Sequence, residues 1–196
     1  MTKSELRKIF LERRRSLSAE EMDEKSRQIA DRLFESGDST AIKTFHCFTQ
    51  IAKFNEIDTS LIYKKVWTDF PAVKTVAPRV NYASGEIENV VFGPETELVE
   101  NEWGIREPVS GERVNDVIID LVLVPLLCFD KRGYRVGYGK GFYDKFLSRC
   151  RPDCVKVGLS YFPPVEKISD IGGHDIRLDR CVTPDAIFDF VKIGRE

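Results

Sequence analysis

The segment of residues 130–141 concentrates glycines and cations, the residue types that bind phosphate. Glycines let backbone N–H groups approach an anion closely, and Arg or Lys side chains neutralise its charge. An apolar run over residues 118–129, interrupted only by Asp120 and Pro125, precedes this loop, and an apolar helical pattern follows from Phe142. The run is typical of a strand covered on both faces. Strand, basic glycine-rich loop and helix in this order predict an anion site.

The common nucleotide fingerprints do not match this loop. A Walker A loop needs Ser or Thr after its lysine, whereas Lys140 is followed by Gly141. A dinucleotide fingerprint needs GxGxxG near the first strand, whereas the glycines here are spaced GxGxG and lie late in the chain. A structural turn is the alternative. The flanking Arg132, Arg135 and Lys140 favour the anion site.

Two further places could contribute charged groups. Lys3 and Arg7 lie four apart on a predicted amphipathic helix over residues 3–17, so they share a face and could clamp a polyphosphate. Spacing alone favours a solvated basic face instead. Glu56 falls in a predicted strand-to-helix loop, and such loops hold ligands in open α/β sheets. Without further evidence, an exposed loop acid is the simpler interpretation.

Other charged and sulfur-containing residues predict no site. Residues 13–15 are consecutive arginines that point in different directions around a helix, so we predict a solvated surface. Five cysteines are an odd, scattered set, which favours reduced thiols over a disulfide framework. Cys150, Cys154 and His174 lack the paired CxxC spacing of zinc sites.

Composition bounds the class of protein. The chain has 196 residues, 42% hydrophobic content, a net charge of −2 and a pI of about 5.9, so it can bury a core but has no global basic footprint for nucleic acid. The first ten residues lack an apolar signal core, and no apolar run approaches the length of roughly 20 residues that spans a membrane. We predict a soluble, cytoplasmic protein.

Alternating helical and strand patterns predict a single α/β domain, residues 1–196, with a mostly parallel central sheet and helices on both faces. Ser18 and Glu21 predict a capping box for a second helix that stops before Gly37. Asp58 and Thr59 predict the cap of a third. The expected elements are helices over 3–17, from 18 and over 60–70, strands over 41–48, 73–78, 155–161 and 186–191, a hairpin over 81–92 and an irregular segment over 163–180.

The segment RGYRVGYGKGFYD, from Arg132 to Asp144, resembles the signature of the 5-formyltetrahydrofolate cyclo-ligase family. The resemblance covers nearly the whole chain. Five more segments match in the family's order along the chain: Lys3-x-x-Leu6-Arg7, Asn55-Glu56-Ile57-Asp58-Thr59, Gly104-Ile105-x-Glu107-Pro108, Leu123-Val124-Pro125 to Phe129-Asp130, and His174-Asp175-Ile176-x-Leu178-Asp179.

The resemblance implies a three-layer α/β sandwich related to the NagB/RpiA/CoA-transferase-like fold. It also implies a cytoplasmic, ATP- and Mg²⁺-dependent enzyme that converts 5-formyltetrahydrofolate, in some cases polyglutamylated, to 5,10-methenyltetrahydrofolate, ADP and phosphate. The implied route phosphorylates the formyl oxygen to give an N5-iminium phosphate, which N10 then attacks. We expect a monomer that binds neither nucleic acid nor membrane.

Residue roles follow from the same resemblance. Lys140 and Glu56 are the implied catalytic residues, with Lys140 at the transferring phosphoryl group and Glu56 at the pterin or its N5-formyl end. Asp144 and Asp175 are the implied Mg²⁺ ligands. Implied ATP contacts are Lys3, Arg7, Arg135, Gly137, Tyr138, Gly139, Lys140, Gly141, Phe142 and Tyr143. Implied folate contacts are Ile51, Glu56, Tyr138, Gly139, Lys140, Gly141 and Phe142, with Trp103 as a further wall residue and His174 as a structural partner of Asp175.

One departure from the family pattern is the bulk of Tyr134 and Tyr138, which predicts a narrower mouth. Two other classes remain as alternatives. A nucleotide-independent sugar-phosphate isomerase or CoA-transferase-like protein would not be stabilised by ATP. A non-catalytic folate- or nucleic-acid-binding protein using residues 13–15 would show steep salt dependence, although the net charge of −2 opposes nucleic acid.

Overall fold

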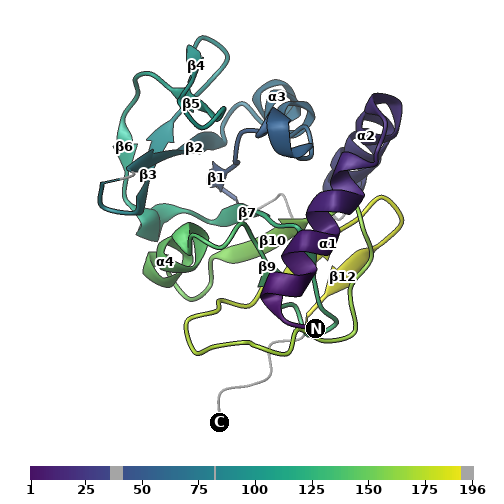
Figure 1. Cartoon of the computed structure of the whole chain (residues 1–196). Helices are drawn as coiled ribbons and strands as arrows, with labels where there is room; N and C mark the ends of the chain where they lie inside the picture. Colours follow the sequence, from purple (N-terminus) through teal and green to yellow (C-terminus); the bar gives the residue numbers. More distant parts are fainter. Residues whose placement is uncertain (36–41, 82, 191–196) are drawn as a thin grey trace.

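The computed structural model describes residues 1–35, 42–81 and 83–190. Within them, a central sheet carries helices on both faces (Figure 1), as predicted. Its strand order is β12-β11-β10-β7-β1-β2-β3-β6. The bounds are β1 Thr44–His46, β2 Lys74–Asn81, β3 Glu86–Val91, β6 Arg113–Val114, β7 Leu121–Pro125, β10 Val155–Leu159, β11 Arg180–Val182 and β12 Ile187–Asp189.

The middle of the sheet is parallel and its edges are antiparallel. Strands β2, β1, β7, β10 and β11 pair in parallel, whereas β3, β6 and β12 run against their neighbours. Parallel strands need crossover connections, which contain a helix between β1 and β2 and between β7 and β10, whereas an irregular segment joins β10 to β11. The carboxyl ends of the five parallel strands therefore meet at one edge of the sheet, where open α/β folds bind ligands.

Among the described residues, three α-helices cover one face of the sheet and one covers the other (Figure 1). The helices are α1 Lys3–Arg15, α2 Ala19–Glu35, α3 Ser60–Asp69 and α4 Phe142–Arg149. Helices α1, α2 and α3 pack on one core and α4 on the other, and side chains of β7 alternate between them: Leu121 and Leu123 face the first core, Val122 and Val124 the second. This alternation is what a doubly covered strand requires.

Capping follows the predicted chemistry for α2 and differs in part for α3. The Ser18 hydroxyl accepts from the Glu21 amide at 3.2 Å, and the Glu21 carboxylate accepts from the Ser18 amide at 2.8 Å. Before α3, the Asp58 carboxylate accepts from the Ser60 amide at 2.9 Å, whereas the Thr59 hydroxyl donates to the Phe48 carbonyl at 2.6 Å. Gly37, Ala41, Tyr82 and Val191, which bordered or lay within predicted elements, lie outside the described residues.

The prediction that residues 118–129 form one strand is wrong. Pro125 ends β7, and the chain turns into a separate two-stranded sheet, β8 Cys128–Phe129 with β9 Arg135–Val136. The glycine-rich segment therefore contains a hairpin. Sequence reasoning also missed β11 and the hairpin of β4 Leu98–Glu100 with β5 Arg106–Pro108, because these strands are only three residues long. So short a run has no measurable period.

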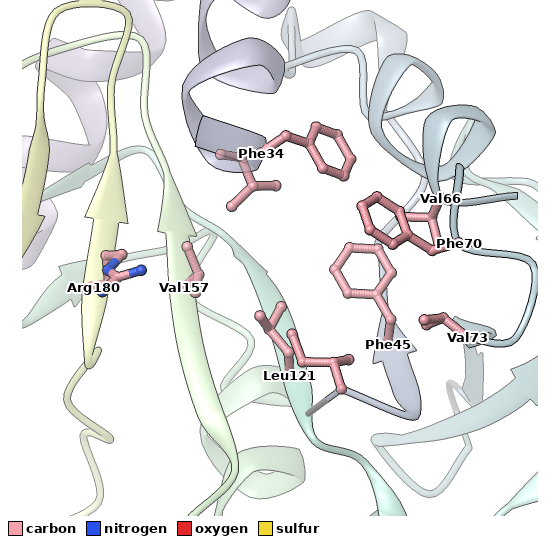
Figure 2. A pocket seen from close by; sticks show the side chains of 10 residues that line it. Phe34, Phe45, Val66, Phe70, Val73, Leu121, Val157 and Arg180 are labelled. Carbon is pink, nitrogen blue, oxygen red and sulfur yellow. The ribbon is translucent and has the colours of Figure 1, made fainter. Parts of the chain in front are cut away.

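A small apolar cavity of about 60 Å³ lies between the carboxyl ends of α2 and α3 and the sheet. Figure 2 shows the rings of Phe34, Phe70 and Phe45 gathered around it. The Phe34 and Phe70 rings stack with centroids 6.0 Å apart. With an almost wholly apolar lining and so little volume, this gap is part of the core.

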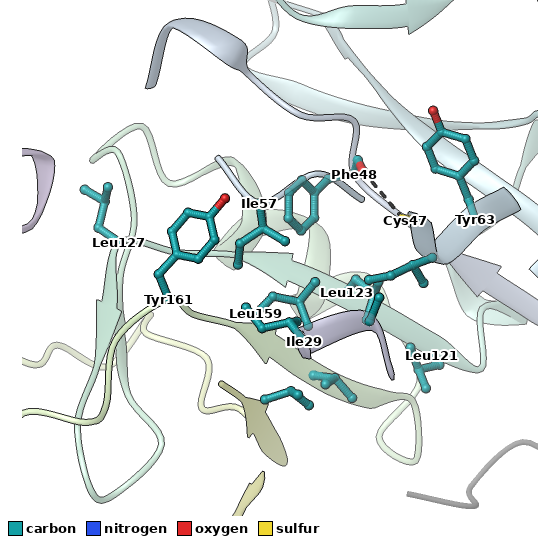
Figure 3. Packing of buried hydrophobic residues seen from close by; sticks show 14 of the residues in the cluster. Ile29, Cys47, Phe48, Ile57, Tyr63, Leu121, Leu123, Leu127, Leu159 and Tyr161 are labelled. Atoms are coloured by element: carbon teal, nitrogen blue, oxygen red, sulfur yellow. Dashed lines mark hydrogen bonds between the residues drawn. The ribbon is translucent and has the colours of Figure 1, made fainter. Parts of the chain in front are cut away.

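The larger core contains the segment that presents Glu56. In Figure 3, Ile57, Phe48 and Tyr161 lie together above Leu123 and Leu159 of the sheet. Ile57 is 2% exposed, so the residue directly after Glu56 is anchored in the core. In the described part of the chain, no helix is both long and apolar enough to cross a bilayer.

Candidate active site

A cavity of about 880 Å³ opens at the carboxyl ends of β1, β2 and β7. Its volume falls in the range of small-molecule sites, roughly 300–1,000 Å³. Every residue that the family resemblance gives an ATP, folate, catalytic or Mg²⁺ role contributes to its lining, although those residues come from both ends of the chain. They are Lys3, Arg7, Ile51, Glu56, Trp103, Arg135, Gly137, Tyr138, Gly139, Lys140, Gly141, Phe142, Tyr143, Asp144 and Asp175.

The glycine-rich loop reaches the cavity through two left-handed residues. Gly141 is the N-cap of α4 at φ 71°, and Gly139 has φ 89°. A Cβ at position 139 would lie 3.1 Å from the Arg7 guanidinium carbon, so any other residue would push the Arg7 side chain away and strain the left-handed backbone. Arg7 Nε also donates to the Gly137 carbonyl at 2.9 Å. Helix α1 and the loop are thereby joined at the cavity wall.

One end of the cavity is built from paired charges. Lys3 Nζ donates to Asp175 Oδ1 at 2.6 Å, and both side chains are about one-fifth exposed, at 22% and 19%. Asp175 Oδ2 also accepts from the Gly172 amide at 2.6 Å. Lys140, by contrast, is exposed at the loop tip. We call this region, formed by Lys3, Arg7, Arg135, Gly137, residues 139–141, Asp144 and Asp175, the phosphate end.

Arg135 and Asp144 form the most buried pair at the phosphate end. Arg135 Nη2 donates to Asp144 Oδ1 at 2.8 Å, and Arg135 Nη1 donates to the Ile176 carbonyl. The Ile176 amide donates to the same Asp144 oxygen at 3.0 Å. Burial lowers the pKa of Arg135, and the carboxylates of Asp144 and Asp175 oppose that shift. The pair ties the loop and α4 to the segment around residue 176.

The other end of the cavity surrounds Glu56. This residue is 2% exposed, and its carboxylate accepts from the Tyr138 hydroxyl at 2.6 Å and from the Ile51 amide at 2.8 Å. Burial raises the pKa of Glu56, while Arg14, the Tyr138 hydroxyl and the Ile51 amide oppose the rise. We call Ile51, Phe54, Glu56, Trp103, Tyr138 and Phe142 the carboxylate end.

Apolar and aromatic side chains enclose the carboxylate end. The Tyr138 and Phe54 rings stack at 5.0 Å with 28° between their planes. Ile51 forms an antiparallel bridge with Ile105, which carries the loop between β4 and β5, including Trp103, onto the cavity. These flat, apolar surfaces suit a planar heterocycle.

Four predictions need correction. His174 is exposed, and the carboxylate of Asp175 contacts Lys3 and the Gly172 amide in its place. Arg132 lies outside the cavity lining, because its guanidinium donates to the fully buried Asp130 at 2.7 Å. Tyr134 lies outside the lining too, and its ring packs beneath Arg132 at 5.2 Å. Tyr138 alone of the two bulky tyrosines projects into the site.

Arg14 is the fourth correction, since it is 2% exposed and not part of a solvated surface. The residues of α1 that share its face, Leu6 and Phe10, are also buried. That spacing, four and eight residues back from position 14, was the signal in the sequence. The buried Arg14 interrupts the basic surface that the nucleic-acid alternative requires.

The carboxylates of Asp144 and Asp175 suit a hard divalent cation that also binds a substrate's phosphates. Both act electrostatically on Arg135, so both lie near one point of the cavity. The described residues contain no group of three or more His, Cys, Asp or Glu that could hold a metal. Magnesium is commonly bound by one or two carboxylates plus phosphate oxygens, so two carboxylates are enough for this fit.

Comparisons with known proteins agree with the geometry. The sequence profile described as the 5-formyltetrahydrofolate cyclo-ligase family matches residues 1–184. The Escherichia coli K12 5-formyltetrahydrofolate cyclo-ligase is 27% identical over 188 residues, covering 93% of this chain and all of that protein. The mouse enzyme of the same name is 26% identical, covering 92% and 93%.

Solved structures extend the likeness to the fold. The Aquifex aeolicus 5,10-methenyltetrahydrofolate synthetase superposes with a TM-score of 0.83 and 33% identity, covering 100% of this chain and 96% of that one. The Mycoplasma pneumoniae synthetase superposes with a TM-score of 0.74 and 25% identity, covering 94% and 99%.

Proposed function

Since the chain belongs to the 5-formyltetrahydrofolate cyclo-ligase family, we propose that it uses ATP to close 5-formyltetrahydrofolate into 5,10-methenyltetrahydrofolate, releasing ADP and phosphate. One observation carries this proposal: a single cavity has cations and a glycine-rich loop at one end and a buried carboxylate among aromatic rings at the other. Such a cavity suits two substrates that must react with each other, one polyanionic and one planar.

The chemistry explains why both ends are needed. An N-formyl oxygen is a weak nucleophile and a poor leaving group, so it must be activated before the ring can close. In the proposed first step, that oxygen attacks the γ-phosphorus, the bond to ADP breaks, and an N5-iminium phosphate forms. The N10 lone pair then attacks the iminium carbon, the C–O bond breaks to release phosphate, and N10 loses its proton. The protein contributes positioning and charge neutralisation.

At the phosphate end, the proposed roles follow the charge. Lys140 is exposed at the loop tip, where it can follow the transferring phosphoryl group. Arg7 lies against Gly139 and can neutralise neighbouring phosphate oxygens. Lys3 can exchange its contact with Asp175 for a phosphate. The backbone of residues 137–141 approaches the same ligand. When bound, Mg²⁺ would offset phosphate charge, held by Asp144 and Asp175.

At the carboxylate end, Glu56 is the proposed acceptor for pterin N–H donors. A pterin presents adjacent ring and amino N–H groups, and a buried carboxylate accepts them strongly. The rings of Phe142 and Trp103, with Ile51, are the proposed walls, and Tyr138 stands between the two ends. This order would direct the N5-formyl group toward the glycine-rich loop.

The test is the growth of the methenyl product's absorbance in purified protein with 5-formyltetrahydrofolate, Mg²⁺ and ATP. The account predicts product only with ATP, and a fall in kcat of about 10²-fold or more for Lys140→Ala. Lys145→Ala is the matched control, because Lys145 is exposed on α4 and outside the cavity lining.

No product from folded wild-type protein with saturating ligands would contradict the proposal. Equal activity in the Lys140 and Lys145 variants would contradict the role of the loop while leaving the reaction intact.

A further inference from the structure

Arg14 is a buried charge that lies behind the cavity wall. It is 2% exposed, and its guanidinium donates to the Leu126 carbonyl and, at 2.9 Å, to the Tyr138 hydroxyl. Its Nε is buried and has no hydrogen-bond partner among the described residues. An incompletely paired buried cation is costly, and an apolar residue of similar size would often be at least as stable. Stability alone therefore does not account for Arg14.

A continuous chain of hydrogen bonds runs from Arg14 to Glu56. The Tyr138 hydroxyl accepts from Arg14 Nη1 and donates its own proton to Glu56 Oε1 at 2.6 Å. That length is typical of a hydroxyl donating to a charged carboxylate. Because the cation polarises the phenol, it strengthens the bond that the phenol makes.

Arg14 is also linked to the Glu56 segment through its backbone. The Asn55 side-chain amide donates to the Arg14 carbonyl at 3.0 Å. Asn55 adopts a left-handed conformation at φ 49°, and it directly precedes Glu56. A non-glycine residue in this region needs surrounding contacts that hold it there. Helix α1 thus fixes both the backbone and the carboxylate of the Glu56 segment.

The groups facing Glu56 come from several elements. Arg14 of α1 and Tyr138 of the glycine-rich loop oppose the rise that burial causes in the pKa of Glu56. Burial of the Tyr143 hydroxyl on α4 raises its pKa, and Tyr161, which follows β10, donates to the Glu56 carbonyl at 3.1 Å. Arg14 is the cation among these groups, so its charge offsets part of the free-energy cost of burying Glu56 as an anion.

We infer that Arg14 is a positioning residue that acts through the Tyr138 hydroxyl to hold Glu56 as an oriented anion for the folate. This inference rests on the proposed function, in which Glu56 binds the pterin. It assigns Tyr138 a task toward Glu56 in addition to its place in the cavity wall. It also gives Arg14 a different role from Arg7 of the same helix, which lies at the phosphate end of the cavity.

The test compares Tyr138→Phe and Arg14→Leu with two matched controls. Tyr134→Phe removes a hydroxyl from the same loop, outside the cavity lining, and Arg15→Leu removes a charge from an exposed position of the same helix. We expect Tyr138→Phe to raise the KM for 5-formyltetrahydrofolate about tenfold, with the KM for ATP unchanged. We expect the acidic limb of its kcat/KM profile to move to higher pH.

The double variant Arg14→Leu with Tyr138→Phe sharpens the test. If Arg14 acts through Tyr138, the two losses are not additive, and the double variant binds the folate about as weakly as the worse single variant. Equal changes in both KM values, or an unmoved acidic limb, would reduce Arg14 and Tyr138 to structural roles and overturn the inference.

Direct folate binding, measured by calorimetry on the same proteins, separates this inference from the proposed function. Wild-type protein that binds 5-formyltetrahydrofolate tightly but forms no product contradicts the proposed function. In that case, about tenfold weaker folate binding by Tyr138→Phe, with unchanged binding by Tyr134→Phe, still supports the hydrogen-bond chain from Arg14 through Tyr138 to Glu56. Equal binding by the two variants overturns it.

Discussion

The two ends of the cavity solve the problem of burying charge in different ways. At the carboxylate end, Glu56 is surrounded by donors that the chain itself supplies, from Tyr138 and the Ile51 amide, with Arg14 behind. At the phosphate end, Lys3 and Asp175 neutralise each other. The first arrangement is already organised for a ligand with N–H donors. The second must exchange partners when a polyanion enters.

This exchange has a clear electrostatic basis. Under the proposed function, Mg²⁺ and ATP would bring both signs of charge, so Asp175 could pass to the metal as Lys3 passes to a phosphate. Neither charge is left unpaired, which avoids the penalty of an isolated buried ion. Arg135 and Asp144 differ from Lys3 and Asp175, because the Arg135 side chain is only 5% exposed. The phosphate end therefore combines a rigid pair with an exchangeable one.

The largest expected effect comes from breaking the rigid pair. Arg135→Met leaves Asp144 without its cation and the Ile176 carbonyl without a donor, so we expect the unfolding free energy to fall by about 3 kcal/mol. Urea denaturation measures this. Arg27→Met is the control, because Arg27 pairs with acids on the exposed face of α2. An equal loss in both variants would remove the distinction between rigid and exchangeable pairs.

Gly139→Ala should have the next largest effect. A left-handed alanine costs about 1–2 kcal/mol, and its Cβ would displace the Arg7 guanidinium. We expect lower stability together with about tenfold weaker ATP binding, and unchanged folate binding. Gly93→Ala, where a Cβ meets nothing within 4 Å, should change neither affinity. Weaker folate binding in Gly139→Ala would show that the two ends are not independent.

Asp175→Asn tests the exchangeable pair with little cost in stability. Its pair with Lys3 is partly solvated, and partly solvated pairs contribute under about 1 kcal/mol. We expect the Mg²⁺ concentration for half-maximal activity to rise about fivefold, because the proposed Mg²⁺ site would lose one of its two carboxylates. Asp153→Asn, at an exposed pair with Arg151, is the control and should leave the Mg²⁺ dependence unchanged.

The smallest expected effect is a pH dependence at the carboxylate end. Burial raises the pKa of Glu56 above its ordinary value of 4.5, so the folded protein binds this proton more tightly than the unfolded chain. The stability from the protonated form is complete below pH 4.5 and is lost as pH rises through the folded pKa. In urea unfolding, wild type should therefore lose stability relative to Glu56→Gln as the pH rises above 4.5. A constant difference would contradict the raised pKa.

The sequence predicted the phosphate end better than the carboxylate end. The segment of residues 130–141 concentrates glycines and cations, so local sequence was enough to predict that its loop lines a cavity. Asp144 and Asp175 depended on the family resemblance, and the structure brings both near Arg135. The pairing of Lys3 with Asp175 joins residues 172 apart, and no local pattern encodes such a contact.

The carboxylate end depends on packing that no short segment reveals. The apolar run over residues 118–129 predicted a single strand, whereas Pro125 ends β7 and a new hairpin begins at β8. That turn brings Tyr138 to Glu56. The run of arginines at 13–15 predicts an exposed Arg14, whereas its spacing from Leu6 and Phe10 places it on the buried face of α1. Burial of a charged residue follows from tertiary contacts that helical periodicity can suggest but composition cannot.

The most direct test of the account is calorimetric binding of each ligand to one variant from each end. A non-hydrolysable ATP analogue with Mg²⁺ and, separately, 5-formyltetrahydrofolate are titrated into wild type, Lys3→Met and Glu56→Gln. The account predicts about tenfold weaker nucleotide binding only for Lys3→Met, and about tenfold weaker folate binding only for Glu56→Gln. If each variant weakened both ligands equally, the division of the cavity into a phosphate end and a carboxylate end would be wrong.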